Sequence, residues 1–126
     1  ALKRDSRITK RGYYFYFLRY DSAKWIGIHR NRFMEALRAE GVPCGTAHND
    51  PVYWNPAFKN IRKYCPITCS NYGKEVDYSK VYCPQAERIY KTEVVAMGKD
   101  FLMEKENVEK ILGAIAKLRD NIDELS

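Results

Sequence analysis

The chain has 126 residues and a mass of 14.8 kDa, which suits one domain with its own apolar core and is too short for two ordinary domains. Its hydrophobic content of 45% and charged content of 30% are typical of a globular protein and exclude a disordered or collagen-like chain. The longest strongly apolar run, Tyr13–Leu18, is far shorter than the ~20 residues of a membrane span, and no secretion signal is visible, so we expect a cytoplasmic protein with no membrane partner.

The net charge of +6 is unevenly distributed. Residues 1–38 carry ten Lys and Arg against three acidic residues, whereas the other 88 residues carry twelve against thirteen. A basic end can bind nucleic acid or another polyanion, but a solvated face, or a face that meets an acidic neighbour, has the same composition. We favour these two simpler explanations and do not expect nucleic acid as a partner.

The cysteines do not have the spacing of a metal site. They are separated by 21, 4 and 14 positions: Cys44, Cys65, Cys69 and Cys83. This pattern contains no Cys-x-x-Cys pair, and neither histidine stands at ligand spacing from a cysteine, so we expect no metal. Cys65 and Cys69 could close a small disulfide loop in an oxidising compartment, but without a secretion signal free thiols are favoured.

The first elements in chain order are a strand and a helix. Residues 1–12 are polar and basic and are interpreted as an entry segment or linker. Residues 13–20 are so rich in aromatic side chains, on both parities, that they predict a central strand buried on most of both faces. From Arg30 the apolar period becomes helical, and Gly41 stands where a helix C-terminus favours glycine, so the pattern predicts a helix over 30–40. Residues 42–46 could form a short second strand.

Residues 45–83 show no sustained period and are predicted to be a long loop. A loop of this length is unusual in a compact domain unless it is functional or held by a partner. It carries many aromatic side chains, which must lie against something: Tyr53, Trp54, Phe58, Tyr64, Tyr72, Tyr78 and Tyr82. This segment is therefore the most suggestive one for function.

The last third of the chain returns to regular patterns. Pro84 suits the first position of a helix through Lys91, and residues 93–97 are typical of a short strand. A final amphipathic helix is predicted from one apolar stripe, which we assign to the core: Val108, Ile111, Leu112, Ile115, Leu118, Ile122 and Leu125. The order of elements predicts an α+β, two-layer domain with helices on one face of a small, mostly antiparallel sheet.

The common catalytic motifs are missing. The sequence has no phosphate-binding Gly-rich loop, no nucleophile elbow and no His-Glu-x-x-His. Residues 11–15 resemble the start of an RNA-binding RNP1 motif, but bulky Tyr14 stands where that motif needs Gly or Ala, and too few residues precede it. Of the two histidines, His29 stands at a helix start, where a cap or surface role is usual. His48, in a polar loop before a proline, is the better candidate for ligand contact.

Three blocks, in this order, carry a family resemblance. The first combines Gly12–Phe17 with Ile26–Pro43, the second is Pro51–Phe58, and the third is Cys83–Arg88 followed by a short strand and the closing helix. Together they resemble the C-terminal small domain of the DegT/DnrJ/StrS family, the pyridoxal-phosphate-dependent sugar and cyclitol aminotransferases of fold type I. The resemblance covers nearly the whole chain from Tyr13 on.

The resemblance implies a transferase that moves an amino group from glutamate or glutamine to a keto sugar or keto cyclitol. It also implies pyridoxal 5'-phosphate as cofactor, a homodimer, and an N-terminal large domain that supplies the cofactor lysine, so that this segment alone is inactive. Residues 13–126 would then be the small domain. It would close over the active site and present its loop to the substrate.

Within that loop the sequence offers four substrate-binding candidates. His48 and Asn49 can hydrogen-bond hydroxyl groups, and Tyr53 and Trp54 can cover a ring face. Equally, Tyr53 and Trp54 could anchor the loop to the domain. A non-catalytic regulatory or dimerisation domain, or a polyanion-binding module, are the alternatives.

The chain also departs from the family pattern. His29 replaces the serine that family members commonly have before this helix, which predicts the loss of an N-cap worth about 1 kcal/mol. Residues 62–82 are longer and more polar than the resemblance implies and could be an insertion.

Overall fold

The structure is a computed structural model that describes residues 5–10, 14–46, 48, 50–59 and 77–125. Its helices and strands follow the chain in this order: β1 (Phe15–Arg19), α1 (Arg30–Ala39), α2 (Pro56–Lys59), α3 (Pro84–Arg88), β2 (Val94–Gly98) and α4 (Lys105–Asp120). Short 3-10 turns and one π-helical turn, Ile89–Glu93, connect them. No helix in these described ranges is long and apolar enough to cross a membrane.

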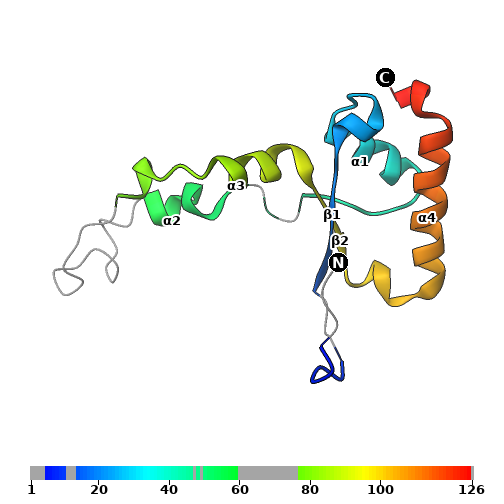
Figure 1. Ribbon diagram of the computed structural model, residues 1–126, viewed down its shortest axis with the longest axis horizontal. Helices are drawn as coiled ribbons and strands as arrows, with labels where there is room; N and C mark the ends of the chain where they lie inside the picture. Colours follow the sequence, from blue (N-terminus) through cyan, green and yellow to red (C-terminus); the bar gives the residue numbers. More distant parts are fainter. Residues whose placement is uncertain (1–4, 11–13, 47, 49, 60–76, 126) are drawn as a thin grey trace.

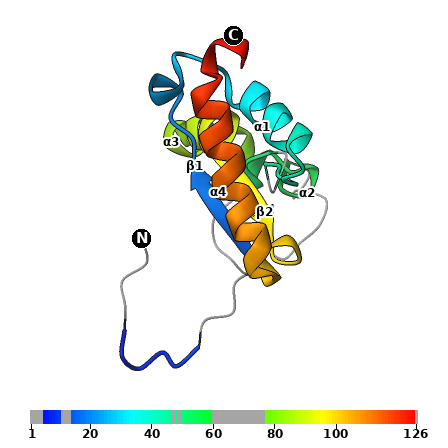
Figure 2. The same ribbon diagram turned by 90° about the vertical axis from the view of Figure 1, so that its right-hand side faces the viewer.

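In the part of the chain that the structure describes, two antiparallel strands form the sheet. β1 pairs with β2 in a register that places Phe15 opposite Gly98 and Arg19 opposite Val94. Helices α1 and α4 lie on one side of this pair, as Figures 1 and 2 show, so the predicted two-layer α+β class is confirmed. The predicted strand over 42–46 is reduced to one bridge, in which the N–H and C=O of Gly45 each bond Ala96, at 2.9 and 2.7 Å.

The core lies between the strands and the two long helices. Val95 and Met97 lie two positions apart on the same face of β2 and are 0% and 1% exposed. Leu37 of α1 is also 0% exposed. An aromatic group extends this core toward the end of β1, where the ring centroids of Trp25 and Phe33 are 4.6 Å apart. Burial on one face of each element is what holds α1 and α4 against the sheet.

The prediction that the aromatic strand is buried on most of both faces is wrong. Tyr16 is 51% and Phe17 56% exposed, and only Leu18 packs against the core from this strand. Among the described residues β1 has one strand neighbour, β2. The register puts Phe15 and Phe17 on the face that α1 and α4 do not cover. The high density of β-forming residues therefore predicted the strand correctly and its burial incorrectly.

The apolar stripe of α4 is narrower than predicted. Ile111, Ala114 and Leu118 are buried, whereas Val108 and Leu112 are 40% and 58% exposed, so assigning those two to the core is wrong. The helix packs against the rest of the domain on one side only, and a narrow stripe at positions i, i+3 and i+7 is wide enough for that contact. The chain leaves the helix at Asp120, and Leu125 is buried from a final 3-10 turn, Ile122–Leu125.

Both ends of α1 are capped, the N-terminus by a side chain and the C-terminus by a glycine turn. The imidazole Nδ1 of His29 accepts a hydrogen bond from the Asn31 N–H at 3.2 Å, so the predicted loss of the N-cap is wrong. At the other end Gly41 has φ +80°, and the N–H groups of Gly41 and Val42 bond the carbonyls of Arg38 and Leu37. This pattern is the Schellman motif, which satisfies the last carbonyls of a helix.

We expect Gly41→Ala to lower the free energy of unfolding by about 1 kcal/mol, because a side chain disfavours the left-handed backbone. Gly113→Ala is the matched control in the exposed part of α4. A Cβ added at either glycine would meet no atom within 4 Å, so the two positions differ in backbone conformation alone. The control should gain ~0.5–1 kcal/mol. Urea unfolding measures both, and equal effects would contradict the assigned role of Gly41.

Two of the four cysteines lie in the described residues. Cys44 and Cys83 are free thiols, and burial raises the pKa of Cys44 above its ordinary value. The Cys44 thiol donates to the Met34 carbonyl oxygen at 3.6 Å, so it serves as a small packing residue. Cys65 and Cys69 lie outside the described residues, and their free state stays a prediction.

Candidate functional site

The described residues 50–59 and 77–83 of the predicted loop form an arm together with the segment that follows, and we define this arm as residues 50–59 and 77–93. It contains α2, α3, the π-helical turn and two 3-10 turns, Val52–Trp54 and Tyr78–Lys80, and these pieces contact one another. In Figure 1 the arm extends away from the strands, on the side opposite α1 and α4.

The predicted absence of structure in the loop is wrong for residues 50–59 and 77–83, where local side chains cap two of the short helical elements. Asn55 Oδ1 accepts from the Ala57 N–H at 2.9 Å at the start of α2, and Asp77 Oδ1 accepts from the Ser79 N–H at 3.0 Å. Elements of three or four residues are too short to produce a readable period. Phe58 and Tyr78 meet at a ring distance of 5.2 Å, so these aromatics bury each other within the arm.

Tyr53 joins the first part of the arm to α3. Its hydroxyl donates to Glu87 Oε1 at 2.7 Å and accepts from the Cys83 N–H at 3.3 Å. Partial burial, and then the bond to the Glu87 carboxylate, raise the pKa of the Tyr53 phenol above its ordinary value. The phenol is therefore protonated near neutral pH and acts as a donor. These contacts favour an anchoring role for this side chain.

Trp54 lies beside Tyr53 in the same cluster. The Lys91 ammonium stands 5.0 Å from the centroid of the Trp54 ring, and it also pairs with Glu87 Oε2 at 3.5 Å. Glu87 thus accepts from the phenol on one oxygen and meets the ammonium on the other. We call Tyr53, Trp54, Glu87 and Lys91 the arm cluster. A cation over an indole is worth ~0.5–1 kcal/mol at an exposed site.

The other two predicted residues are not part of this cluster. His48 is exposed, between the Gly45–Ala96 bridge and the arm, and its N–H bonds the Thr46 carbonyl at 2.9 Å. Among the described residues, no contact of the arm cluster involves His48. Asn49 lies outside the described residues. The structure thus brings together Tyr53 and Trp54, and the substrate role of all four side chains stays a prediction.

Sequence reasoning missed Glu87 and Lys91. Their signal was available, because an acid four residues before a base on a predicted helix places both on one face. Chemically, the arm cluster combines an indole, a carboxylate and an ammonium. These groups can stack on a ring and exchange hydrogen bonds with hydroxyls.

Arg30 fixes the base of the arm. Its guanidinium donates from one terminal nitrogen to the Tyr90 carbonyl at 2.6 Å and to the Val94 carbonyl at 3.3 Å, and the residue is only 5% exposed. Those carbonyls belong to the π-helical turn and the start of β2. A π-helical turn interrupts the regular bonding of a helix, and a buried donor can satisfy the carbonyls it frees. Arg30 therefore sets how the arm leaves the domain.

We expect Tyr53→Phe to loosen the arm without unfolding the domain. The change removes the bond to the partly exposed Glu87 carboxylate and the longer bond from the Cys83 N–H, which together contribute about 1–2 kcal/mol, and the cost should be local. Amide hydrogen exchange should accelerate in residues 52–59 and 83–91 while the amides of α1 and β2 stay unchanged. Tyr82→Phe is the control, since Tyr82 is 71% exposed. Equal exchange in the two variants would show that the phenol does not hold the arm.

Comparison with known proteins places the chain beside aminotransferases. No family model matches it. It is 32% identical over 126 residues to a protein of Micromonospora echinospora, 35% over 123 residues to one of Streptomyces kanamyceticus, and 34% over 123 residues to one of Streptoalloteichus tenebrarius. All three carry the provisional name L-glutamine:3-amino-2,3-dideoxy-scyllo-inosose aminotransferase. These matches cover 96–98% of the chain, which spans about three tenths of the length of these curated relatives.

Proposed function

We propose that the chain is the small domain of a pyridoxal-phosphate-dependent aminotransferase of the DegT/DnrJ/StrS type. The whole enzyme would move an amino group from L-glutamine or glutamate to a keto cyclitol or keto sugar. The observation that supports this proposal is the identity of 32–35% over almost the entire chain to three proteins named as L-glutamine:3-amino-2,3-dideoxy-scyllo-inosose aminotransferases.

The proposed role of this segment is to complete a site formed mainly by an N-terminal large domain, in a homodimer. The arm supports that role, because it reaches away from the domain's own core and carries polar and aromatic groups at its surface. A polyhydroxylated ring needs hydrogen-bonding partners together with a flat apolar face. His48, Asn49 and the arm cluster offer that combination.

The described residues do not fit covalent attachment of the cofactor. A lysine that forms a Schiff base is usually desolvated or placed beside another cation. Every lysine whose side chain the structure places is exposed, and several are paired with a carboxylate, as Lys99 is with Asp100 at 2.7 Å and Lys117 with Glu40 at 2.8 Å. The proposal therefore assigns attachment of the cofactor to the large domain.

The full-length protein offers a direct test. Purified with pyridoxal phosphate, it should show a visible absorption band of a protein-bound imine, and L-glutamine should bleach that band. Supplying a keto cyclitol such as 3-amino-2,3-dideoxy-scyllo-inosose should restore the band and yield the corresponding amine, detected by mass spectrometry. The absence of any band would reassign the protein to a regulatory or dimerisation role.

We expect His48→Ala, in the full-length enzyme, to raise KM for the keto cyclitol about tenfold, because a side-chain hydrogen bond to substrate contributes ~1–1.5 kcal/mol. KM for the amino donor should not change. His29→Asn is the control, since it alters the other histidine and keeps a good helix cap. Unchanged kinetics for His48→Ala would favour a purely structural arm.

The exposed aromatic face of β1 supports a second candidate, binding of a polyanion. Buried rings would have excluded base stacking, but Phe17 is 56% exposed and Phe15 is half-buried, with ring centroids 5.9 Å apart. Tyr13 lies outside the described residues. Fluorescence titration with single-stranded RNA tests this candidate: tight binding that weakens steeply with salt would support it, and no binding at low salt would exclude it.

A further inference from the structure

A polar cavity of about 380 Å³ lies where the end of β1, the turn before α1, the start of α1 and the π-helical turn meet. Its charged lining consists of three arginines and two carboxylates: Arg19, Arg30, Arg88, Asp21 and Glu93. A volume of this size lies within the ~300–1,000 Å³ range of small-ligand sites. The arm cluster is not part of this lining.

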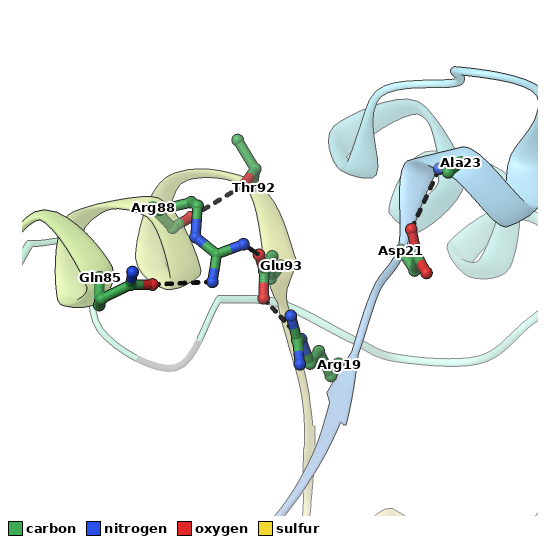
Figure 3. Close-up of polar contacts among 7 residues, drawn as sticks. All are labelled: Arg19, Asp21, Ala23, Gln85, Arg88, Thr92 and Glu93. Atoms are coloured by element: carbon green, nitrogen blue, oxygen red, sulfur yellow. Dashed lines mark hydrogen bonds and ion pairs between the residues drawn. The ribbon is translucent and has the colours of Figure 1, made fainter.

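Glu93 holds two of the arginines in place. Its side chain is 10% exposed, and it meets Arg19 Nε and a terminal nitrogen of Arg88, each at 2.7 Å. Arg88 is also bound by Gln85 at 2.9 Å, as Figure 3 shows. The Arg19 contact is made through Nε, so its two terminal nitrogens are not part of it. The two guanidinium groups are thus oriented before any ligand arrives.

Arg30 adds a buried and incompletely satisfied donor to the same lining. The residue is 5% exposed, and its Nε has no hydrogen-bond partner among the described residues. Its terminal nitrogens are engaged by the Tyr90 and Val94 carbonyls and by Asn31 Oδ1 at 3.3 Å. A buried N–H without a partner costs free energy that a bound acceptor recovers.

The charges of the lining favour an anion. Three guanidinium groups face two carboxylates, and one of those, Asp21, already accepts from the Ala23 N–H at 3.2 Å. Glu93 is shared between two cations. A network that served stability alone would have no need of an open cavity or of a buried donor left unsatisfied by the described residues. The arginine fork is the group best suited to bind carboxylate or phosphate oxygens.

We propose that this cavity binds a small oxyanion, a carboxylate or phosphate group, with Arg19 and Arg88 as its ligands and Glu93 as the residue that positions them. The proposal does not rest on the function proposed above. It concerns a site on this chain that can be measured without substrate or turnover.

Isothermal titration calorimetry of the full-length protein tests the site with two probes that are not proposed substrates, inorganic phosphate and acetate, at an ionic strength held constant with sodium chloride. We expect saturable binding of at least one probe below about 10 mM. Tighter binding of phosphate would identify a phosphate site, and tighter binding of acetate a carboxylate site. No saturable binding of either probe would overturn the proposal.

Two variants and a charge-matched control locate the binding. Arg19→Gln and Arg88→Gln change side chains that are 73% and 52% exposed, so both variants should fold, and each should weaken binding about tenfold or more. Lys99→Gln removes the same charge from the opposite end of β2 and should leave binding unchanged. If all three variants behaved alike, the binding would be nonspecific and the proposal would fail.

Discussion

Leu37→Ala is expected to lower the free energy of unfolding by about 3–5 kcal/mol. Leu37 is 0% exposed and lies on the core face of α1. Its backbone carbonyl also accepts the hydrogen bond from the Val42 N–H in the Schellman turn. Removing its branched side chain leaves a cavity between α1 and the sheet that the close-packed core cannot refill.

Urea unfolding of the 126-residue chain, followed by circular dichroism, measures this effect. Leu112→Ala is the matched control, because Leu112 is 58% exposed on α4 and its truncation should cost well under about 1 kcal/mol. Leu37→Met keeps the volume and should cost less than about 1.5 kcal/mol. If the two truncations, Leu37→Ala and Leu112→Ala, lowered the free energy of unfolding equally, Leu112 would be buried in the protein. That result would support the wider apolar stripe predicted from the sequence and contradict the exposure of Leu112 in the structure.

Local signals predicted the elements better than their surroundings. The helix over 30–40 followed from an apolar period and a glycine at its end, and both features act within a few residues. Burial of β1 and of Leu112 was predicted incorrectly because it depends on which other layers exist. A strand rich in aromatic residues has the sequence pattern of a central strand whether its second face contacts another part of the chain, a partner or solvent.

The candidate site was predictable only in part, for a related reason. Tyr53 and Trp54 stand out as aromatic residues in a polar loop, and the structure places them in one cluster. Their partners come from a helix more than thirty positions later, so the bond from Tyr53 to Glu87 could not be read from local pattern. The arginine cavity was missed for the same reason, since its lining comes from two segments far apart in the sequence, residues 19–30 and 88–93.

Arg30→Met is expected to destabilise the chain by about 2–4 kcal/mol, because it leaves the Tyr90 and Val94 carbonyls without their donor at a buried position. Methionine keeps most of the length of the side chain, so the loss reports the hydrogen bonds more than the packing. Beyond global stability, the base of the arm should open, since these two bonds join the π-helical turn and the start of β2 to α1.

Hydrogen exchange separates the two effects. In Arg30→Met the amides of residues 89–95 should exchange faster than the global loss of stability explains. Arg32→Met is the control: it removes the same charge two positions later, where the side chain is 56% exposed, pairs with Glu35 at 3.9 Å and donates from Nε to the Leu125 carbonyl at 3.4 Å, so its contacts lie away from residues 89–95. Surface pairs of this kind contribute ~0–1 kcal/mol, so little change is expected. If exchange at 89–95 rose no more in Arg30→Met than in Arg32→Met, the arm would be fixed by the β2 connection itself and not by the buried guanidinium.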